Sequence, residues 1–155
     1  MVKIGIIGPE SSGKSTLAQQ LARRYGEYIP EYARDYVAAL NGHYTYDDVL
    51  TIARHQVEQL RTLDNEARSD DERVLFFDTE LIVTKVWLEH KYGTCPEWVT
   101  EALRRYPMDI YLLCTPDIPW IADPTRENPH IRQYLFNWYE REIQALDIPY
   151  YIIRH

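Results

Sequence analysis

The sequence predicts an α/β protein in which helices cover both faces of a parallel sheet of about five strands. Short apolar runs alternate with longer segments of helical periodicity along the whole of the 155 residues. Consecutive strands that are joined through a helix run parallel, and their crossover connections are right-handed. No internal repeat, low-complexity tract or flexible linker interrupts this pattern, so we expect a single domain over residues 1–155.

The predicted strands are short apolar runs that end at a glycine, a proline or a polar residue. They are Val2–Ile7, Glu27–Ile29, Arg73–Phe77, Ile110–Cys114 and Tyr150–Ile153. The run from Arg73 shows no alternation of polar and apolar residues, which is typical of a strand buried on both faces. Pro30 closes the brief second strand, because proline has no N–H to donate to the sheet.

The predicted helices have apolar residues at three- and four-residue spacing between recognisable start and stop signals. They are Ser15–Tyr25, Tyr32–Leu40, Tyr46–Arg68, Thr79–Tyr92, Pro96–Arg105 and Ile131–Leu146. Gly26 and Gly93 end two of them, and Thr45 is placed to cap the longest. Residues 116–129 are polar and proline-rich, so we expect a mobile loop there.

A glycine-rich segment joins the first predicted strand to the first predicted helix. Residues 8–15 read Gly-Pro-Glu-Ser-Ser-Gly-Lys-Ser and match the pattern G-x-x-x-x-G-K-[ST] without a mismatch. Such a loop wraps its N–H groups around phosphate, its lysine reaches the β- and γ-phosphates, and its hydroxyl binds Mg2+. A turn that only joins the two elements would need neither Lys14 nor Ser15. We therefore predict the P-loop NTPase fold, with a nucleotide site made of Gly8, Ser11, Ser12, Gly13, Lys14, Ser15 and Thr16.

An aspartate follows the third predicted strand. Four apolar residues, 74–77, precede Asp78, and this order is typical of the carboxylate beside Mg2+ in P-loop proteins. Asp78 is therefore predicted to act with Ser15 at the metal. Two alternatives stay open. Asp78 could cap the helix expected from Thr79, or it could take the proton from an acceptor hydroxyl.

The helix after the second predicted strand begins with the charged residues Glu31, Arg34 and Asp35. The carboxyl ends of parallel strands meet at one edge of the sheet, so these residues should lie near the phosphate loop. Glu31 is predicted to orient or deprotonate an acceptor hydroxyl, with Tyr32, Arg34 and Asp35 around the same substrate. The alternative is an ordinary first turn, in which the helix dipole favours acids.

The loop after the fourth predicted strand carries the candidates for a lid. Arg126 is the first choice for an arginine that closes over the phosphates, and Arg132 on the next helix is the second. Either could instead form an ordinary solvated ion pair. Trp120 is predicted to stack on the acceptor or to pack the closed lid. Asp123 is predicted to bind ligand hydroxyls or to begin a turn with Pro124.

The composition limits the partners that we expect. The formal charge of −7 disfavours nucleic acid, whose phosphates need a basic face. No apolar run approaches the roughly 18 residues that span a bilayer, and the first residues lead straight into a strand without a secretory signal. We expect a cytoplasmic protein with a small-molecule partner and no nucleic-acid or membrane partner. The sequence does not define the oligomeric state, and a homo-oligomer stays open.

Four segments together resemble a known family. They are GPESSGKST at 8–16, EYARDYV at 31–37, FFDTELIVTKVWLEHKYG at 76–93 and WIADPTREN at 120–128. The set is similar to the ribosylnicotinamide kinase domain of bacterial NAD-salvage proteins, and to the wider group of related P-loop ATPase/kinase domains. The resemblance implies a nucleoside-kinase-like fold with a lid and a sheet in the order 2-3-1-4-5. It also implies ATP as the phosphoryl donor and nicotinamide riboside as the acceptor.

The leading hypothesis is therefore a kinase that uses ATP and Mg2+ to convert nicotinamide riboside to nicotinamide mononucleotide. Its catalytic residues would be Lys14, Asp78, Glu31 and Arg126. Two other functions stay open. One is a regulatory module that binds nucleotide without phosphorylating a metabolite, and the other is a kinase for a different nucleoside or small alcohol.

Overall fold

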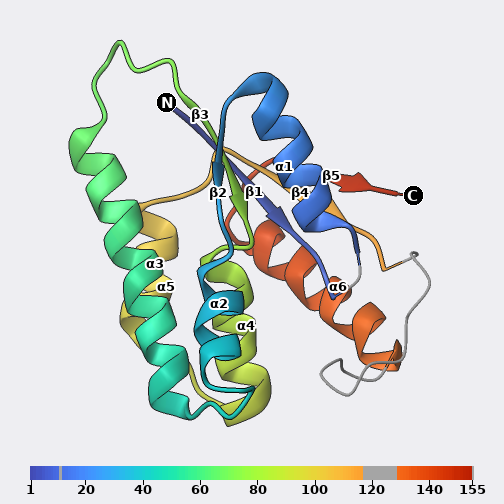
Figure 1. The fold of residues 1–155 in the computed structure, drawn as a ribbon. Coiled ribbons are helices and arrows are strands. Elements are labelled where there is room, and N and C mark those ends of the chain that lie inside the picture. The colour runs from blue at the N-terminus through green and yellow to red at the C-terminus, as the bar shows by residue number, and fades with distance from the viewer. Residues whose placement is uncertain (11, 117–128, 155) are drawn as a thin grey trace.

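The computed structural model of the chain describes residues 1–10, 12–116 and 129–154. Strands and helices alternate along them as predicted (Figure 1). The strands are β1 (Val2–Ile7), β2 (Glu27–Ile29), β3 (Val74–Asp78), β4 (Ile110–Cys114) and β5 (Tyr150–Ile153). The helices are α1 (Lys14–Tyr25), α2 (Tyr32–Ala39), α3 (Tyr46–Glu66), α4 (Leu81–Tyr92), α5 (Glu97–Arg105) and α6 (Pro129–Ala145).

The five strands form one parallel sheet in the order β2-β3-β1-β4-β5, so the predicted order is confirmed. β1 lies in the centre, with Ile6 opposite Asp78 on β3 and Ile4 opposite Ile110 on β4. Because every neighbouring pair is parallel, the carboxyl ends of the strands meet at one edge. The segments that follow β1, β2 and β3 therefore lie along this edge, where sheets of this kind bind ligands.

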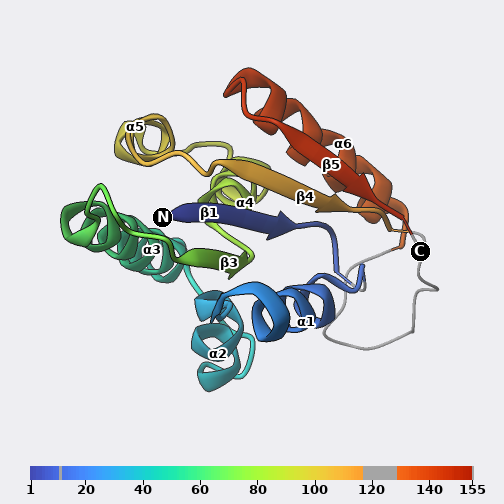
Figure 2. The same cartoon turned by 90° about the horizontal axis from the view of Figure 1, so that it is seen from above.

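Helices cover both faces of the sheet, which confirms the three-layer α/β fold. On one face, Ala18 of α1 packs in a small core with Phe76 of β3. On the other face, a larger core combines Phe77 and Leu113 of the sheet with buried residues of α3, α4, α5 and α6, among them Ile82. The two views place α1 and α4 on opposite sides of β1 (Figures 1 and 2). Among the described residues, no helix is both long and apolar enough to cross a membrane.

The start of α4 differs from the prediction. A helix was expected from Thr79, with Asp78 as a possible cap, whereas α4 begins at Leu81 and its N-cap is Glu80. The Glu80 carboxylate accepts a hydrogen bond from the N–H of Ile82 at 2.9 Å. Thr79 cannot extend the helix, because its φ of 66° lies in the left-handed region. The capping role considered for Asp78 is therefore wrong, and its carboxylate is left for another partner.

The other helices begin and end close to the residues predicted from the sequence. Thr45 caps α3 through a capping box with Asp48, as expected from the sequence. Pro96 was expected in the first turn of α5 and is instead its N-cap. α6 begins at Pro129 rather than at Ile131. Most of the loop expected over 116–129 lies outside the described residues.

Candidate active site

The phosphate loop connects β1 to α1 at the carboxyl edge of the sheet. Gly13 precedes α1 with a φ of 79°, a left-handed conformation that favours glycine. Gly8 is required for a different reason. A Cβ at this position would lie 2.8 Å from the carbonyl oxygen of Cys114 on β4, which is closer than real Cβ atoms approach. Both glycines therefore keep the loop folded closely against the sheet.

The first turn of α1 is suited to an anion. Its N-cap, Gly13, has no side chain that could bond the first N–H groups, and the turn carries no acidic residue. These N–H groups and the positive end of the helix dipole would favour a phosphate there. Lys14 and Ser15 are half-buried at this end of the helix, Ser12 is buried and Thr16 is exposed. The predicted ligand Ser11 lies outside the described residues.

Asp78 ends β3 beside the phosphate loop. It pairs across the sheet with Ile6, two residues before Gly8, and only 1% of its surface is exposed. The hydroxyl of Tyr28 on β2 donates to its Oδ2 atom at 2.6 Å. Its other oxygen, Oδ1, is buried and has no hydrogen-bond partner within the part of the chain that the structure describes.

This carboxylate fits the requirements of a magnesium ion. Mg2+ prefers oxygen ligands and is usually held by one or two carboxylates together with the phosphates of a nucleotide. A buried carboxylate oxygen without a partner is costly, and a cation beside it would remove that cost. Oδ1 of Asp78 offers such an oxygen next to the loop that carries the Ser15 hydroxyl.

Glu31 is the N-cap of α2, directly after β2, but its side chain makes no capping hydrogen bond. Burial raises the pKa of the Glu31 carboxyl, the positive charge of Lys14 opposes this rise, and the negative charge of Asp78 adds to it. The Nε atom of Arg34 lies 4.0 Å from Glu31 Oε2, and the Arg34 side chain is 68% exposed. The Glu31 carboxylate is therefore within electrostatic reach of Lys14 and Asp78. It forms no hydrogen bond that caps α2.

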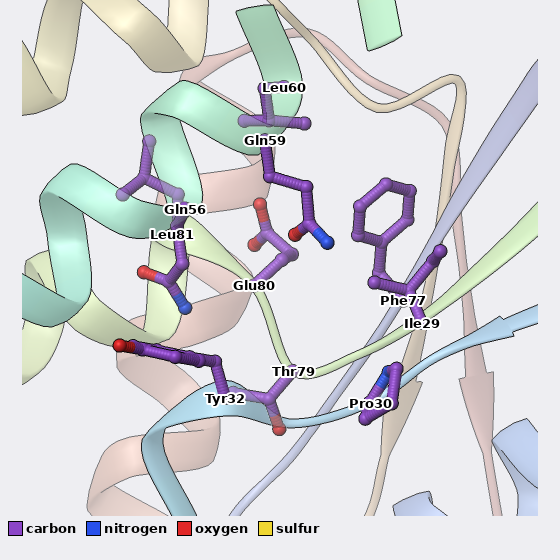
Figure 3. A pocket seen from close by; sticks show the side chains of 10 residues that line it. All are labelled: Ile29, Pro30, Tyr32, Gln56, Gln59, Leu60, Phe77, Thr79, Glu80 and Leu81. Carbon is purple, nitrogen blue, oxygen red and sulfur yellow. The ribbon is translucent and has the colours of Figure 1, made fainter. Parts of the chain in front are cut away.

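A narrow pocket is formed by residues from β2, α2, α3 and the β3–α4 junction, and its lining includes the two chain neighbours of Glu31, Pro30 and Tyr32 (Figure 3). It has room for about one water molecule in this conformation. Its lining residues are Ile29, Pro30, Tyr32, Gln56, Gln59, Leu60, Phe77, Thr79, Glu80 and Leu81. The Tyr32 ring stacks on His55 with centroids 3.6 Å apart. Oε1 of Gln56 accepts from the Thr84 hydroxyl at 2.6 Å, which fixes the orientation of this amide.

The β3–α4 junction carries strain and a buried acid. Thr79 is β-branched, adopts a φ of 66°, and its buried hydroxyl has no hydrogen-bond partner among the described residues. Next to it, Glu80 is 4% exposed. Burial raises the pKa of Glu80 to about 7, although hydrogen bonds from the Ile82 N–H and the Tyr111 hydroxyl oppose the rise. Strained residues of this kind are frequent at functional sites.

The structure brings together some of the predicted site residues and not others. Gly8, Gly13, Lys14, Ser15, Glu31 and Asp78 lie on three neighbouring segments at one edge of the sheet. Asp35 is exposed on α2, and Arg132 is buried at 6% exposure in the first turns of α6, so their roles stay predictions. Trp120, Asp123 and Arg126, with the predicted lid, lie outside the described residues.

Sequence reasoning missed three polar residues of this region: Tyr28, Gln56 and Glu80. Gln56 lies among the buried residues of α3 and is 8% exposed. A polar side chain on the apolar stripe of a helix was the available signal, because buried polar groups need partners. For Tyr28 the sequence offered no such signal.

The fold and the site define a P-loop α/β protein with the architecture of nucleoside kinases. The chain belongs to the family described as AAA domain (AAA_28), which matches residues 3–155. It is homologous to the trifunctional NAD biosynthesis/regulator protein NadR of Escherichia coli (strain K12), with 31% identity over 128 residues. NadR of Salmonella typhimurium (strain LT2) gives the same identity over the same length. The family resemblance drawn from the four sequence segments is therefore confirmed.

The homologous region is only a part of these relatives. The match to E. coli NadR covers 79% of this chain and 30% of the relative. The structure of NadR protein in complex with NR has a TM-score of 0.72 and 24% identity, and covers 97% of this chain and 45% of that one. The structure of NadR protein in complex with NAD and AMP-PNP has a TM-score of 0.66 and 26% identity, and covers 97% of this chain and 43% of that one. A deoxyadenosine kinase from M. mycoides has a TM-score of 0.64 and 14% identity, and covers 98% of this chain and 90% of that one. At this identity the similarity supports the fold alone.

Proposed function

We propose that this protein transfers the γ-phosphoryl group of ATP to a hydroxyl of a nucleoside, with Mg2+ as the metal, in a single domain over residues 1–155. The observation that carries the proposal is the position of Glu31. Its half-buried carboxylate lies at the end of β2, within electrostatic reach of Lys14 and Asp78, and makes no helix cap. A carboxylate held beside a phosphate site is placed to act on an acceptor hydroxyl.

The nucleotide would be held by the phosphate loop. The loop N–H groups and Lys14 would bind the β- and γ-phosphates, and Ser15 and Asp78 would hold the metal. When bound, Mg2+ neutralises charge on the phosphate oxygens and fixes their geometry. Such a reaction depends mainly on positioning and charge neutralisation, which this arrangement of a lysine, a hydroxyl and a buried carboxylate provides.

The acceptor would lie on the side of Glu31. A base works best when its pKa is near the pH of the reaction, and burial moves the pKa of Glu31 upward in that direction. Tyr32 and the polar groups of the pocket in Figure 3 would surround the acceptor ring once that pocket opens. Arg34 and Asp35 are the further predicted substrate contacts. Trp120 and Asp123 would contact the acceptor, and Arg126 and Arg132 would close over the phosphates.

Nicotinamide riboside is the acceptor that we propose, with nicotinamide mononucleotide as the product. The four sequence segments, the homology to NadR proteins and the similarity to a NadR structure in complex with NR support this choice. When the purified protein is incubated with ATP, Mg2+ and nicotinamide riboside, a product should form that carries one phosphate more than nicotinamide riboside. Without nicotinamide riboside this product should be absent. The panel should also contain deoxyadenosine, cytidine and a simple sugar alcohol. No phosphorylated product across the whole panel would contradict the kinase function.

A nucleotide-binding regulatory module is the second candidate. The narrowness of the pocket beside Tyr32, which has room for about one water molecule, favours it. Calorimetry separates the two functions. A kinase should bind nicotinamide riboside in the presence of AMP-PNP, whereas a regulatory module should bind the nucleotide with an affinity that no nucleoside changes.

Glu31→Gln tests the role of the acid. We expect kcat to fall on the order of 100-fold, because glutamine cannot accept a proton, while ATP binding is retained. In the wild type, activity should rise as pH increases through the raised pKa of Glu31, since the base acts in its ionised form. This rise should be absent in the variant. Glu27→Gln, which removes an exposed carboxylate from β2, the strand that precedes Glu31, should keep the wild-type pH profile. A wild-type kcat in Glu31→Gln would rule out the base.

A further inference from the structure

Tyr28 lies on β2 and directs its hydroxyl to the end of β3. The hydroxyl donates to Oδ2 of Asp78 at 2.6 Å, a short bond of the strong kind that carboxylates form. The two side chains can meet because Tyr28 pairs with Phe76 across the sheet, two residues before Asp78. The phosphate-loop motif itself does not require a tyrosine at this position.

This bond restricts the carboxylate. Each of the two oxygens of a carboxylate can accept hydrogen bonds or bind a cation. The backbone of Asp78 is held by its pairing with Ile6, and Oδ2 is held by the Tyr28 hydroxyl. Oδ1 is buried and has no hydrogen-bond partner among the residues that the structure describes. Rotation of the carboxylate is thereby limited, and Oδ1 keeps one orientation beside the phosphate loop.

The same hydroxyl also connects α1 to Asp78. The side chain of Gln19, on α1, hydrogen-bonds the Tyr28 hydroxyl. Tyr28 thus joins the helix that begins at Lys14 to the strand that ends at Asp78.

We infer that Tyr28 is a positioning residue for the metal site, which holds Asp78 so that Oδ1 faces the cation bound by Ser15 and the nucleotide. The inference rests on the proposed function for the assignment of Asp78 to the metal. Tyr28 would act on the metal through Asp78, because its hydroxyl bonds Oδ2 of that carboxylate. Removal of a group that orients a metal ligand typically costs about 10- to 100-fold in metal affinity or activity.

Tyr28→Phe tests the inference, because it removes the hydroxyl and keeps the ring. Titration calorimetry would measure the affinity of the whole chain for AMP-PNP, first in EDTA and then over a series of Mg2+ concentrations. We expect the affinity in EDTA to stay at the wild-type value. We expect the Mg2+ concentration that gives half of the full gain in AMP-PNP affinity to rise about 10-fold. Tyr150→Phe is the matched control, because Tyr150 on β5 donates to Glu140 at 2.9 Å and should affect neither quantity.

A double variant separates positioning from a general loss of structure. Asp78→Asn removes the charged ligand itself, so adding Tyr28→Phe to it should change the Mg2+ requirement no further. Wild-type Mg2+ dependence in Tyr28→Phe, or an equal loss of affinity with and without Mg2+, would overturn the inference. Nucleotide binding that gains nothing from Mg2+ in the wild type would overturn it as well. The readout needs no acceptor, so a failure of the proposed kinase reaction would show separately, in the nucleoside panel.

Discussion

Lys14→Ala should reduce phosphoryl transfer on the order of 1,000-fold, because it removes the positive charge that the phosphate loop provides. Lys14 is the first residue of α1 and is half-buried directly after Gly13. Phosphoryl transfer depends on neutralising the phosphate oxygens while they are held in line, which the loop N–H groups alone do only in part. The rate of product formation at saturating ATP and nicotinamide riboside, in variant and wild type, measures this effect.

Lys91→Ala is the matched control for this variant. Lys91 is exposed in the last turn of α4, so its loss should leave turnover unchanged. NMR titration of the Glu31 carboxyl gives a second readout that does not depend on activity. The charge of Lys14 holds the pKa of Glu31 down, so in Lys14→Ala this pKa should rise further above its usual value. Wild-type turnover in Lys14→Ala would remove the phosphate site from the proposal.

The phosphate loop could be predicted from the sequence because its requirements are local. The left-handed Gly13 and the close approach at Gly8 are conditions that one or two residues meet, and only glycine meets them without strain. The strands could be placed for a similar reason, since each is a short apolar run with a clear end. The strand order is not local, and it followed from the resemblance rather than from any pattern of residues.

The rest of the site depends on contacts between distant segments. The bond from Tyr28 to Asp78 joins residues that are 50 apart in the chain, and that from Thr84 to Gln56 spans 28. A hydrophobic pattern records polarity and spacing but does not show which buried polar groups become partners. The left-handed Thr79 likewise cannot be read from a pattern, and it moves the helix cap from Asp78 to Glu80.

Glu80 is a carboxyl that the fold removes from water. Its side chain is 4% exposed, accepts from the N–H of Ile82 at 2.9 Å and hydrogen-bonds the Tyr111 hydroxyl. Burial raises its pKa from 4.5 to about 7, because these hydrogen bonds compensate only part of the lost hydration. In the unfolded chain the carboxyl is hydrated and keeps the lower value. Ionisation of Glu80 therefore favours the unfolded state.

Glu80→Gln should remove this pH-dependent loss of stability. In the wild type, the contribution of Glu80 to the free energy of unfolding is complete below about pH 4.5, where the carboxyl is protonated in the folded and the unfolded state. This contribution is lost as the pH rises through about 7. A pKa difference of this size lowers the free energy of unfolding by up to about 3 kcal/mol. Glutamine keeps an oxygen for the Ile82 N–H but cannot ionise. The variant should therefore be about 2 to 3 kcal/mol more stable than the wild type near pH 8, and similar to it near pH 4.

Urea unfolding of the wild type, Glu80→Gln and Glu97→Gln over this pH range measures the difference. Glu97 is exposed in the first turn of α5, so its variant controls for the loss of one carboxylate from a helix start. The gain in free energy of unfolding caused by Glu80→Gln should increase with pH, and this increase should exceed any increase caused by Glu97→Gln. The reason is that only the buried carboxyl loses its hydration on folding. A gain that stays constant from acid to alkaline pH would mean that Glu80 ionises equally well in both states. Such a result would contradict a buried cap at the start of α4, beside the pocket that we assign to the acceptor.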